Sequence, residues 1–206
     1  MAFTLFVDGY FVNQYDATCY VALEEKGVTY SISRALLHEN QTFVPAMHAK
    51  TRIARVPAMQ HDDFWLTESM AIVEYLDDVL PSPRLLPADY RERARARQIM
   101  AWLRFELRSV REERPWYRVI YREPEPPLSA KAACEVKELF DLVARLDAGG
   151  DLGTWNIAHV DLALTLVRLV RTEELPRPAR RLLDEQLARP SVKSYMTHAR
   201  PPHAPP

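Results

Sequence analysis

The sequence predicts two unlike halves, a small mixed α/β domain followed by a domain made only of helices. Short strand patterns alternate with helix patterns over the first 80 residues, whereas the remainder shows no strand signal of comparable strength. Prolines at positions 81, 83 and 87 separate the halves and indicate a linker. We therefore expect domains at residues 1–81 and 88–200, with residues 201–206 forming a disordered tail.

Each element of the first domain has a local signal. Phe3–Val7 is rich in strand-forming residues, and Asp8-Gly9 supplies turn chemistry behind it. Gly27 stands where a helix end needs left-handed backbone, and Thr67 is available to cap the last helix. The expected elements are, in order, a strand at 3–7, a helix at 14–26, a strand at 29–33, an irregular segment at 38–54, a hairpin with strands at 56–60 and 64–66, and a helix beyond Thr67.

The second half is predicted to be a helical bundle. The stretch from Ile157 to Val170 is apolar nearly all round, so we expect it at the centre, surrounded by other helices. Asn156 can cap this helix, His159 lies three residues on, and Asp161 needs a hydrogen-bonding partner, so we predict structural roles for all three. The expected helices are 88–113, 128–147, 157–170, 178–188 and 191–198, with a long connection after Pro115 marked by Pro124, Pro126 and Pro127.

The composition excludes several classes of protein. Of 206 residues, 48% are hydrophobic and 27% are charged, which is typical of a globular protein. The longest strongly apolar stretch is interrupted by Asp161 and Arg168 and is far shorter than the roughly 20 residues that cross a bilayer, so no membrane partner is expected. The N-terminus lacks the features of a secretory signal, and two cysteines, Cys19 and Cys134, suit a reducing compartment. These features predict a cytoplasmic protein.

The charges are unevenly distributed along the chain. Residues 1–80 hold 5 basic and 11 acidic side chains, whereas residues 81–206 hold 22 basic and 17 acidic ones. Residues 91–122 alone contain ten arginines against four glutamates, but no aromatic-interleaved pattern or recognition helix accompanies them, so nucleic acid is not the expected partner. The six histidines show no metal-ligand spacing, and no metal is expected.

The most informative pattern pairs Arg55-Val56-Pro57 with Glu68-Ser69, which begins eleven residues after Pro57. Pro57 stands at a strand start and is a candidate for a cis peptide bond. Glu68 and Ser69 open a helix, where free backbone amides and the helix dipole both favour a carboxylate. Taken alone, the Glu68-Ser69 pair also fits a capping arrangement with no ligand.

In this order, and ahead of an all-helical domain, the two patterns resemble the glutathione transferase family. The resemblance covers nearly the whole chain. It extends to the buried helix start at residues 155–161 and to the closing segment at 189–193, while residues 93–104 and 111–115 look most like a bacterial cytosolic subgroup of that family. It implies a thioredoxin-like N-terminal domain joined to an all-α C-terminal helical bundle.

The resemblance also implies roles for individual residues in binding glutathione. Val56 would pair its backbone N–H and C=O with the cysteinyl backbone, and a cis Pro57 would present it. Glu68 would take the ammonium of the γ-glutamyl end, while Ser69 and the helix amides would take its carboxylate. Arg55 either reaches the glycine carboxylate or is a solvated arginine at a strand end.

Catalysis in this family depends on ionising the glutathione thiol, which is mostly protonated at neutral pH. The donor that stabilises the thiolate follows the first strand. The related subgroup is expected to have Ser-Pro-Tyr there, whereas this chain has Asn13-Gln14-Tyr15. Asn13 is therefore predicted as both a catalytic and a glutathione-binding residue, donating through its amide, with Tyr10 and Tyr15 as alternative donors. Cys19 lies in mid-helix and is predicted to be a small buried hydrophobe.

The implied activity is that of a glutathione transferase acting on a hydrophobic electrophile or reducing an organic hydroperoxide. The second substrate is expected against the long helix that carries Trp102, Phe105, Arg108 and Arg111 and against the following Trp116-Tyr117, although a dimer interface explains that helix equally well. A homodimer is expected from the family and from the opposite charges of the two halves.

Two other functions stay open. One is a glutathione-dependent isomerase, although the Ser-Ser-Cys signature of the maleylacetoacetate isomerases is absent. The other is a non-catalytic regulatory or binding protein that keeps the fold, as the stringent-starvation proteins do, which Asn13 in place of a hydroxyl residue leaves possible.

Overall fold

The computed structural model describes residues 2–35, 47, 49–51, 53, 55–80, 82–149 and 153–203. Most of the predicted irregular segment at 38–54, together with Pro81, Gly150 and the last three residues of the predicted tail, lies outside this range. The chain forms two compact units. The first comprises Met1–Leu85 with Ser194–Pro206, and the second comprises Leu86–Lys193, so the final residues group with the first unit.

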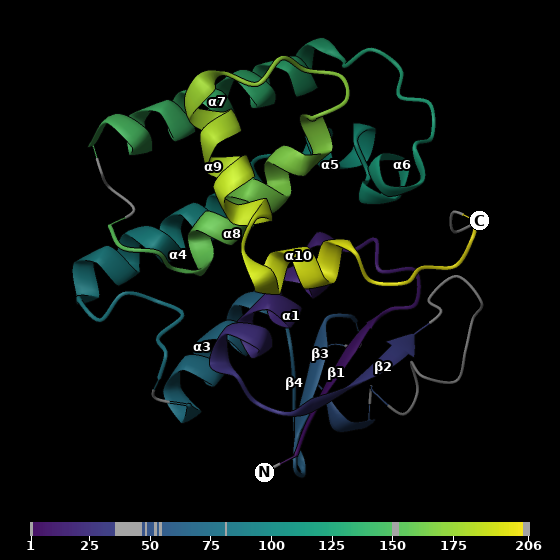
Figure 1. Cartoon of the computed structure of the whole chain (residues 1–206), viewed down its shortest axis with the longest axis vertical. Coiled ribbons are helices and arrows are strands. Elements are labelled where there is room, and N and C mark those ends of the chain that lie inside the picture. The colour runs from purple at the N-terminus through teal and green to yellow at the C-terminus, as the bar shows by residue number, and fades with distance from the viewer. Residues whose placement is uncertain are drawn as a thin grey trace. The chain divides into compact units, whose positions relative to one another are not determined.

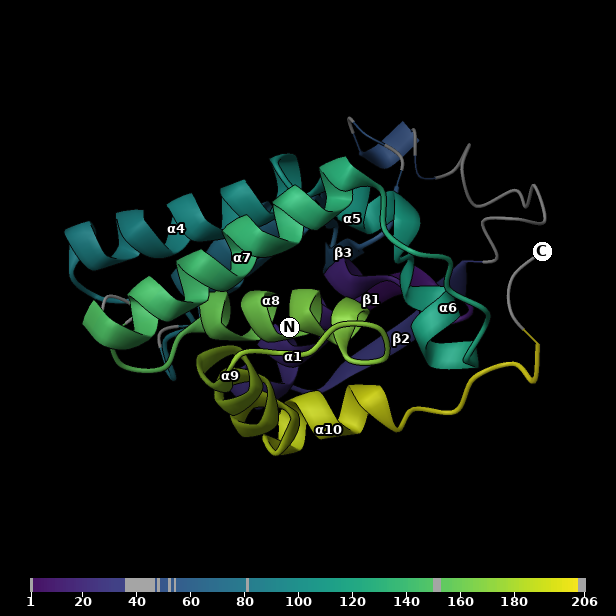
Figure 2. The same cartoon turned by 90° about the horizontal axis from the view of Figure 1, so that it is seen from above.

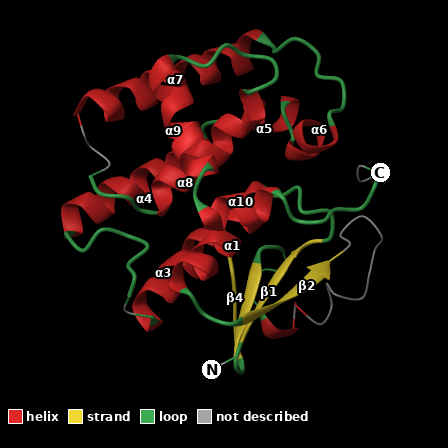
Figure 3. Cartoon of the chain, viewed as in Figure 1, coloured by secondary structure: helices red, strands yellow, loops and turns green. Residues whose placement is uncertain are grey.

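A four-stranded sheet organises the first unit (Figure 3). Its strands are β1 (Phe3–Asp8), β2 (Tyr30–Ala35), β3 (Ala58–His61) and β4 (Phe64–Thr67), arranged in the order β2-β1-β3-β4. β1 runs parallel to β2 and antiparallel to β3, which in turn pairs antiparallel with β4. The predicted hairpin is confirmed, whereas the predicted strand at 29–33 begins one residue later and extends to Ala35.

Two helices of the first unit, α1 (Gln14–Lys26) and α3 (Ser69–Val79), pack against each other and against the sheet (Figure 1). α1 has the predicted bounds, and Gly27 ends it with a φ of 64°, a conformation that glycine adopts without steric cost. On the sheet, Phe6, Val56 and Ala58 form an apolar cluster with Ala35 and Met47, against which Trp65 packs.

The second unit consists of helices, as expected (Figure 3). Seen from above, α4 and α7 run beside each other (Figure 2). The predicted central helix is α8, and its residues are buried on all sides with the exception of the half-buried His159. The elements are α4 (Tyr90–Phe105), α5 (Arg108–Glu113), α6 (Trp116–Tyr121), α7 (Ala130–Gly149), α8 (Ile157–Leu166) with a 3-10 extension (Val167–Leu169), and α9 (Arg177–Leu187). The last helix, α10 (Pro190–Met196), spans the point at which the chain passes back into the first unit.

Two predictions for the second half are wrong. The single helix expected at 88–113 is divided into α4 and α5, because the amides of Ser109 and Val110 donate to the buried carboxylate of Glu135 on α7 (3.2 and 2.9 Å). This cap comes from a distant helix and leaves no local signal. The connection expected after Pro115 contains α6, which Trp116 anchors by donating its indole N–H to the carbonyl of Leu164 (3.1 Å).

Candidate functional site

Three chain segments meet at one edge of the sheet. Phe6 of β1 lies opposite Ala58 of β3, which lies opposite Thr67 of β4. The segment that follows β1, the residues before β3 and the residues after β4 therefore share this edge. The same edge therefore carries Val56, Glu68, Ser69 and the loop at 9–13, which leads from β1 into α1.

Val56 lies at this edge with its side chain buried. Its backbone precedes the first paired residue of β3. The Val56–Pro57 peptide bond is cis, as predicted. The Val56 side chain packs in the apolar cluster, while strand pairing of β3 begins only at Ala58. The backbone N–H and C=O of Val56 are thus outside the strand ladder, where an extended ligand backbone can pair with them.

Glu68 and Ser69 form a sharp corner between β4 and α3. Glu68 has a φ of 71°, an uncommon conformation for a residue with a side chain, and its side chain makes no cap bond to the helix. The prediction that Thr67 caps α3 is wrong, because Thr67 is the last residue of β4 and Glu68 occupies the cap position. Ser69 is buried in the first turn, where backbone amides point at an incoming anion.

Arg55 lies next to Glu68 rather than apart from it. The guanidinium Nε is 3.5 Å from the Glu68 carboxylate, and both side chains are largely exposed (65% and 50%). An exposed pair of this kind holds weakly and can open for a charged ligand. Four of the five predicted binding residues, Arg55, Val56, Glu68 and Ser69, are therefore gathered at one corner of the first unit.

Asn13 stands at the N-terminus of α1, the predicted place for a thiolate donor. Its side-chain oxygen accepts a hydrogen bond from the backbone amide of Tyr15 (2.9 Å), which makes Asn13 the cap of the helix. Because the oxygen is used in this cap, the amide nitrogen is the end of the side chain that carries hydrogens to donate. The positive end of the helix dipole lies at the same position.

Two buried acidic residues, Asp8 and Asp16, hold the loop at 9–13 and the strand end before it. The Asp16 carboxylate accepts from the backbone amide of Asp8 (2.6 Å), and the Asp8 carboxylate accepts from the amide of Val12 (3.3 Å). Burial raises the pKa of Asp16 well above its ordinary value; the hydrogen bond from Asp8 opposes this and the Asp8 charge adds to it. Sequence reasoning missed Asp16, whose only signal is an acidic residue among buried positions of α1.

The residues predicted to meet a second substrate have different environments in the second unit. Trp116 is buried in the helical core, and Arg111 donates to the carbonyl of Leu103 (3.0 Å). Phe105 is 78% exposed at the end of α4, and Arg108 pairs with Glu112. Trp102 instead lines a groove of about 530 Å³ between α4 and α7, whose other walls are Arg95, Gln98, Ile99, Glu138, Asp141, Leu142, Arg145 and Leu146.

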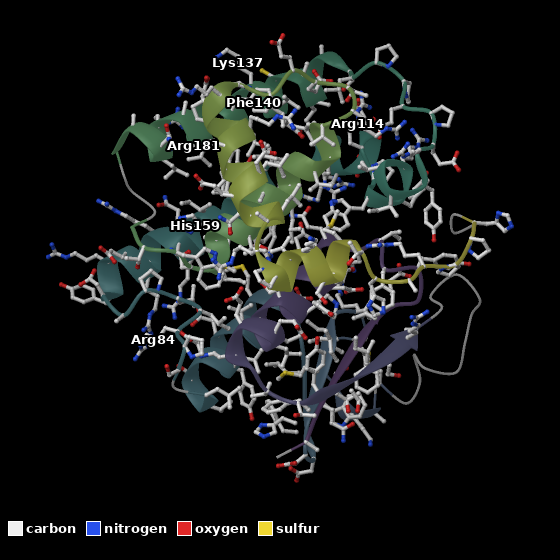
Figure 4. The ribbon with its side chains drawn as sticks, viewed as in Figure 1. Arg84, Arg114, Lys137, Phe140, His159 and Arg181 are labelled. Atoms are coloured by element: carbon white, nitrogen blue, oxygen red, sulfur yellow. The ribbon has the colours of Figure 1, made fainter. Side chains whose placement is uncertain are left out.

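His159 and Asn156 have the structural roles predicted for them. The Asn156 side chain accepts from the amide of Ala158 (3.0 Å), and the His159 ring bonds the backbone of Asn156, which forms a capping box at the start of α8. Burial lowers the pKa of His159, so its ring is neutral near pH 7. Figure 4 labels this histidine within the helical unit.

Asp161 also has the hydrogen-bonding partner that its buried position requires. Arg104 of α4 donates to its carboxylate at 2.6 Å, so the pair ties α8 to α4. The partners of His159 and Asp161 thus give both residues a structural role rather than a catalytic one. Within the described part of the chain, no cluster of residues suited to a metal ion is found, and no helix is both long and apolar enough to cross a membrane.

Comparison with known proteins assigns both parts of the chain to one family. A family model described as the N-terminal domain of glutathione S-transferase matches residues 7–78, and a model of the C-terminal domain matches residues 89–200. A solved structure, of a glutathione transferase homolog from Burkholderia gl BGR1 with bound glutathione, is 34% identical, with a TM-score of 0.74, and the alignment covers 95% of this chain and 96% of that one.

Curated relatives match over shorter stretches. Maleylacetoacetate isomerase from Mus musculus is 37% identical over 81 residues, which is 38% of this chain and 38% of that protein. Glutathione S-transferase theta-3 from Mus musculus is 27% identical over 113 residues, which is 52% of this chain and 47% of that protein. The chain thus spans less than half the length of these two relatives.

Proposed function

We propose that this chain, which belongs to the glutathione S-transferase family, binds reduced glutathione at the edge formed by the ends of β1, β3 and β4 and activates its thiol. One observation carries the proposal. Three features lie at the same edge of the sheet: the Val56–Pro57 bond, the Glu68-Ser69 corner and the loop that leads to Asn13. They do so because Phe6 of β1 pairs with Ala58 of β3, which pairs with Thr67 of β4. The similar Burkholderia protein with bound glutathione supports the choice of ligand.

In this proposal the tripeptide lies extended along the edge. The backbone of Val56 pairs with the cysteinyl backbone, since its N–H and C=O lie outside the β3 ladder. Ser69 and the first amides of α3 hold the γ-glutamyl carboxylate, and Glu68 holds the ammonium. When glutathione binds, Arg55 exchanges its exposed contact with Glu68 for the glycine carboxylate.

Asn13 then faces the sulfur and stabilises it as a thiolate. Lowering a thiol pKa by about two units takes roughly 2.7 kcal/mol. A hydrogen bond from the Asn13 amide to the charged sulfur contributes about 1.5–3 kcal/mol, and the positive end of α1 adds to it. The cap bond from Tyr15 supports this role because it engages the side-chain oxygen, so the amide nitrogen is the end that can donate to a ligand.

The reaction we propose is attack of the thiolate on a hydrophobic electrophile or on an organic hydroperoxide. A glutathione-dependent cis–trans isomerisation is the second candidate, favoured by the similarity to the mouse maleylacetoacetate isomerase over part of the chain. Turnover with a chloronitrobenzene, cumene hydroperoxide and a maleyl-type cis diketo acid separates the three activities. The transferase and peroxidase assays consume glutathione, whereas isomerisation leaves its concentration unchanged.

Calorimetric titration with glutathione tests the binding site itself. We expect Ser69→Ala to weaken binding by about 1–3 kcal/mol, because the ligand carboxylate loses a hydrogen-bonding partner in a buried position. Ser31→Ala, an exposed serine on β2, is the matched control and should bind as the wild type does. An unchanged dissociation constant for Ser69→Ala, or no binding by the wild type at millimolar glutathione, contradicts the proposal.

A further inference from the structure

The C-terminal end of the chain lies against the loop at 9–13. The hydroxyl of Tyr195 donates to the backbone carbonyl of Asn13 (3.2 Å), and Nε of Arg200 donates to the backbone carbonyl of Phe11 (3.2 Å). All four residues belong to the first compact unit, although more than 180 positions along the chain separate each donor from its acceptor. The two contacts reach the loop from a segment that no local sequence signal connects with it.

Both donors are also held by contacts other than their bonds to the loop carbonyls. Tyr195 is fully buried, and its ring meets the rings of Phe11 and Tyr20 at centroid distances of 5.7 and 5.3 Å. The Arg200 guanidinium donates to three carbonyls around the end of α10, those of Tyr195 (3.1 Å), Met196 (2.8 Å) and His198 (3.0 Å). Because these bonds fix the guanidinium, the bond from its Nε–H to the Phe11 carbonyl costs little additional side-chain entropy.

The loop requires such support because its backbone is strained at one position. Phe11 has a φ of 53°, a conformation that is unfavourable for a residue with a side chain and persists only where surrounding contacts enforce it. The Phe11 ring is fully buried. Its centroid lies 4.1 Å from that of the tilted His198 ring and 4.8 Å from the guanidinium carbon of Arg34. The C-terminal segment supplies several of these contacts.

The buried acids also bind the loop and the end of β1 that precedes it. Asp8 accepts from the amide of Val12, and Asp16 in turn accepts from the amide of Asp8. The amide of Val12 is therefore bound by a buried acid, and the carbonyls of Phe11 and Asn13 are bound by the C-terminal segment. A displacement of Tyr195 or Arg200 would shift the backbone that carries the Asn13 side chain.

We propose that Tyr195 and Arg200 are positioning residues that hold Asn13 in place to stabilise the glutathione thiolate. The proposal rests on the proposed function, since it takes Asn13 as the thiolate donor. Neither residue touches the substrate in this scheme. Their effect passes through two backbone carbonyls, so it should alter the ionisation and reactivity of the bound thiol and leave the contacts at Val56, Glu68 and Ser69 intact.

The test uses Tyr195→Phe and Arg200→Lys in the full chain. Tyr195→Phe keeps the buried ring and removes only the hydroxyl that reaches Asn13, and Arg200→Lys keeps the charge and removes the fork of donors. Tyr20→Phe is the matched control, because the Tyr20 hydroxyl bonds Ser194 (2.8 Å) in the same aromatic cluster and, within the described part of the chain, makes no hydrogen bond to the loop. Thermal unfolding of each variant shows that the fold is retained.

We expect both variants to lower kcat by about 3- to 10-fold, which corresponds to one net hydrogen bond, while the dissociation constant for glutathione stays within about twofold of the wild type. The absorbance of the bound thiolate should titrate at a higher pH in both. Tyr20→Phe should match the wild type. Unchanged kcat and thiolate titration in both variants, or a loss confined to glutathione affinity, overturns the proposal.

Hydrogen exchange at the amides of residues 9–13 separates this proposal from the proposed function. Faster exchange there in Tyr195→Phe than in Tyr20→Phe supports the positioning of the loop, and equal exchange in the two overturns it. If the wild type fails to bind glutathione, the proposed function fails, and exchange at 9–13 still decides whether the C-terminal segment holds the loop.

Discussion

The Asn13 side chain has two ends, and among the residues that the structure describes its oxygen is the end with a partner. Its oxygen caps α1 through the amide of Tyr15, which an aspartate or a serine could also do. Its nitrogen is a donor, which an aspartate side chain at neutral pH does not provide. Substitutions at this position can therefore keep the cap and change only the group offered to the thiol.

Asn13→Asp and Asn13→Ser test this residue with the cap preserved. We expect Asn13→Asp to lower kcat by at least about tenfold, because a negative charge beside the sulfur raises the thiol pKa. Asn13→Ser should be at least as active as the wild type, since a hydroxyl donates to a thiolate at least as well as a neutral amide. Steady-state kinetics and the thiolate absorbance check both expectations, with melting temperature as the control for the cap.

An Asn13→Asp variant that turned over as fast as the wild type would show that another donor stabilises the thiolate. Tyr10 and Tyr15, both half-buried beside this helix start, would be the next residues to change. Asn13→Ala is less informative, since it also removes the cap and costs about 0.5–2 kcal/mol of stability for that reason alone.

Asp16 predicts a dependence of stability on pH. Its pKa is raised in the folded state, mainly by burial, so the native protein binds a proton more tightly than the unfolded chain does. Stability from this group is therefore complete below the ordinary pKa of about 3.9 and is lost as the pH rises toward the folded value. Asp16→Asn keeps an oxygen for the Asp8 amide and removes this loss.

We expect the melting temperature of Asp16→Asn to exceed that of the wild type by more at pH 8 than at pH 4.5. Calorimetric scans at the two pH values measure the difference, and Asp63→Asn, at an exposed turn, serves as the control. An equal difference at both pH values would mean that Asp16 does not take up a proton on folding.

At the scale of elements, a buried ion pair joins α1 to the end of α3. The Lys26 ammonium donates to the Asp77 carboxylate (2.8 Å) and to the carbonyl of Leu80 (2.5 Å), and both charged side chains are almost completely buried. Asp77 also accepts from the amide of Leu85 (2.7 Å), which fastens the start of the following segment. The ends of both helices therefore depend on one pair of charges.

Removing one member of this pair should be costly. We expect Lys26→Met to lower the free energy of unfolding by about 3–5 kcal/mol, because it leaves the Asp77 carboxylate buried with its main cation gone. Lys137→Met is the control, since Lys137 projects from α7 into solvent beside Asp141 and should leave stability unchanged (Figure 4). Urea unfolding measures both; a small effect of Lys26→Met would show that Arg84, 4.0 Å from Asp77, replaces the lost charge.

At the scale of the whole molecule, we expect a homodimer. The acidic first 80 residues and the basic remainder favour contact between unlike halves of two copies. The groove between α4 and α7, with Trp102 and Leu142 among arginines and acids, offers an apolar patch with a charged rim. Leu142→Arg should shift the chain toward the monomer in sedimentation experiments, and high salt should act in the same direction.

Ala144→Arg is the matched control for this experiment, because Ala144 is exposed on the same helix and does not line the groove. A Leu142→Arg variant that sediments as the wild type does would exclude the groove as the interface. A wild-type chain that sediments as a monomer at every concentration would exclude the dimer itself.

Features that depend on contacts between neighbouring residues were predicted from the sequence, and features that depend on contacts between distant residues were not. Local signals predicted α1 with its glycine end, the hairpin of β3 and β4 and the capping box of α8, and the family resemblance predicted the cis bond before Pro57. The left-handed backbone of Glu68 was not predicted. The break between α4 and α5 was not predicted either, because it depends on Glu135 of another helix.

The amino-acid sequence by itself determined the two-part fold, since turn, cap and strand preferences act within a few residues. Its motifs also determined the family, and the resemblance to that family supplied the five residues proposed to bind glutathione. Only the tertiary structure decided what holds Asn13 in place. The bonds from Tyr195 and Arg200 and the buried pair of Asp8 and Asp16 form between groups that burial brings together. Buried polar groups must find partners wherever the packed chain supplies them, and this requirement acts across the whole fold.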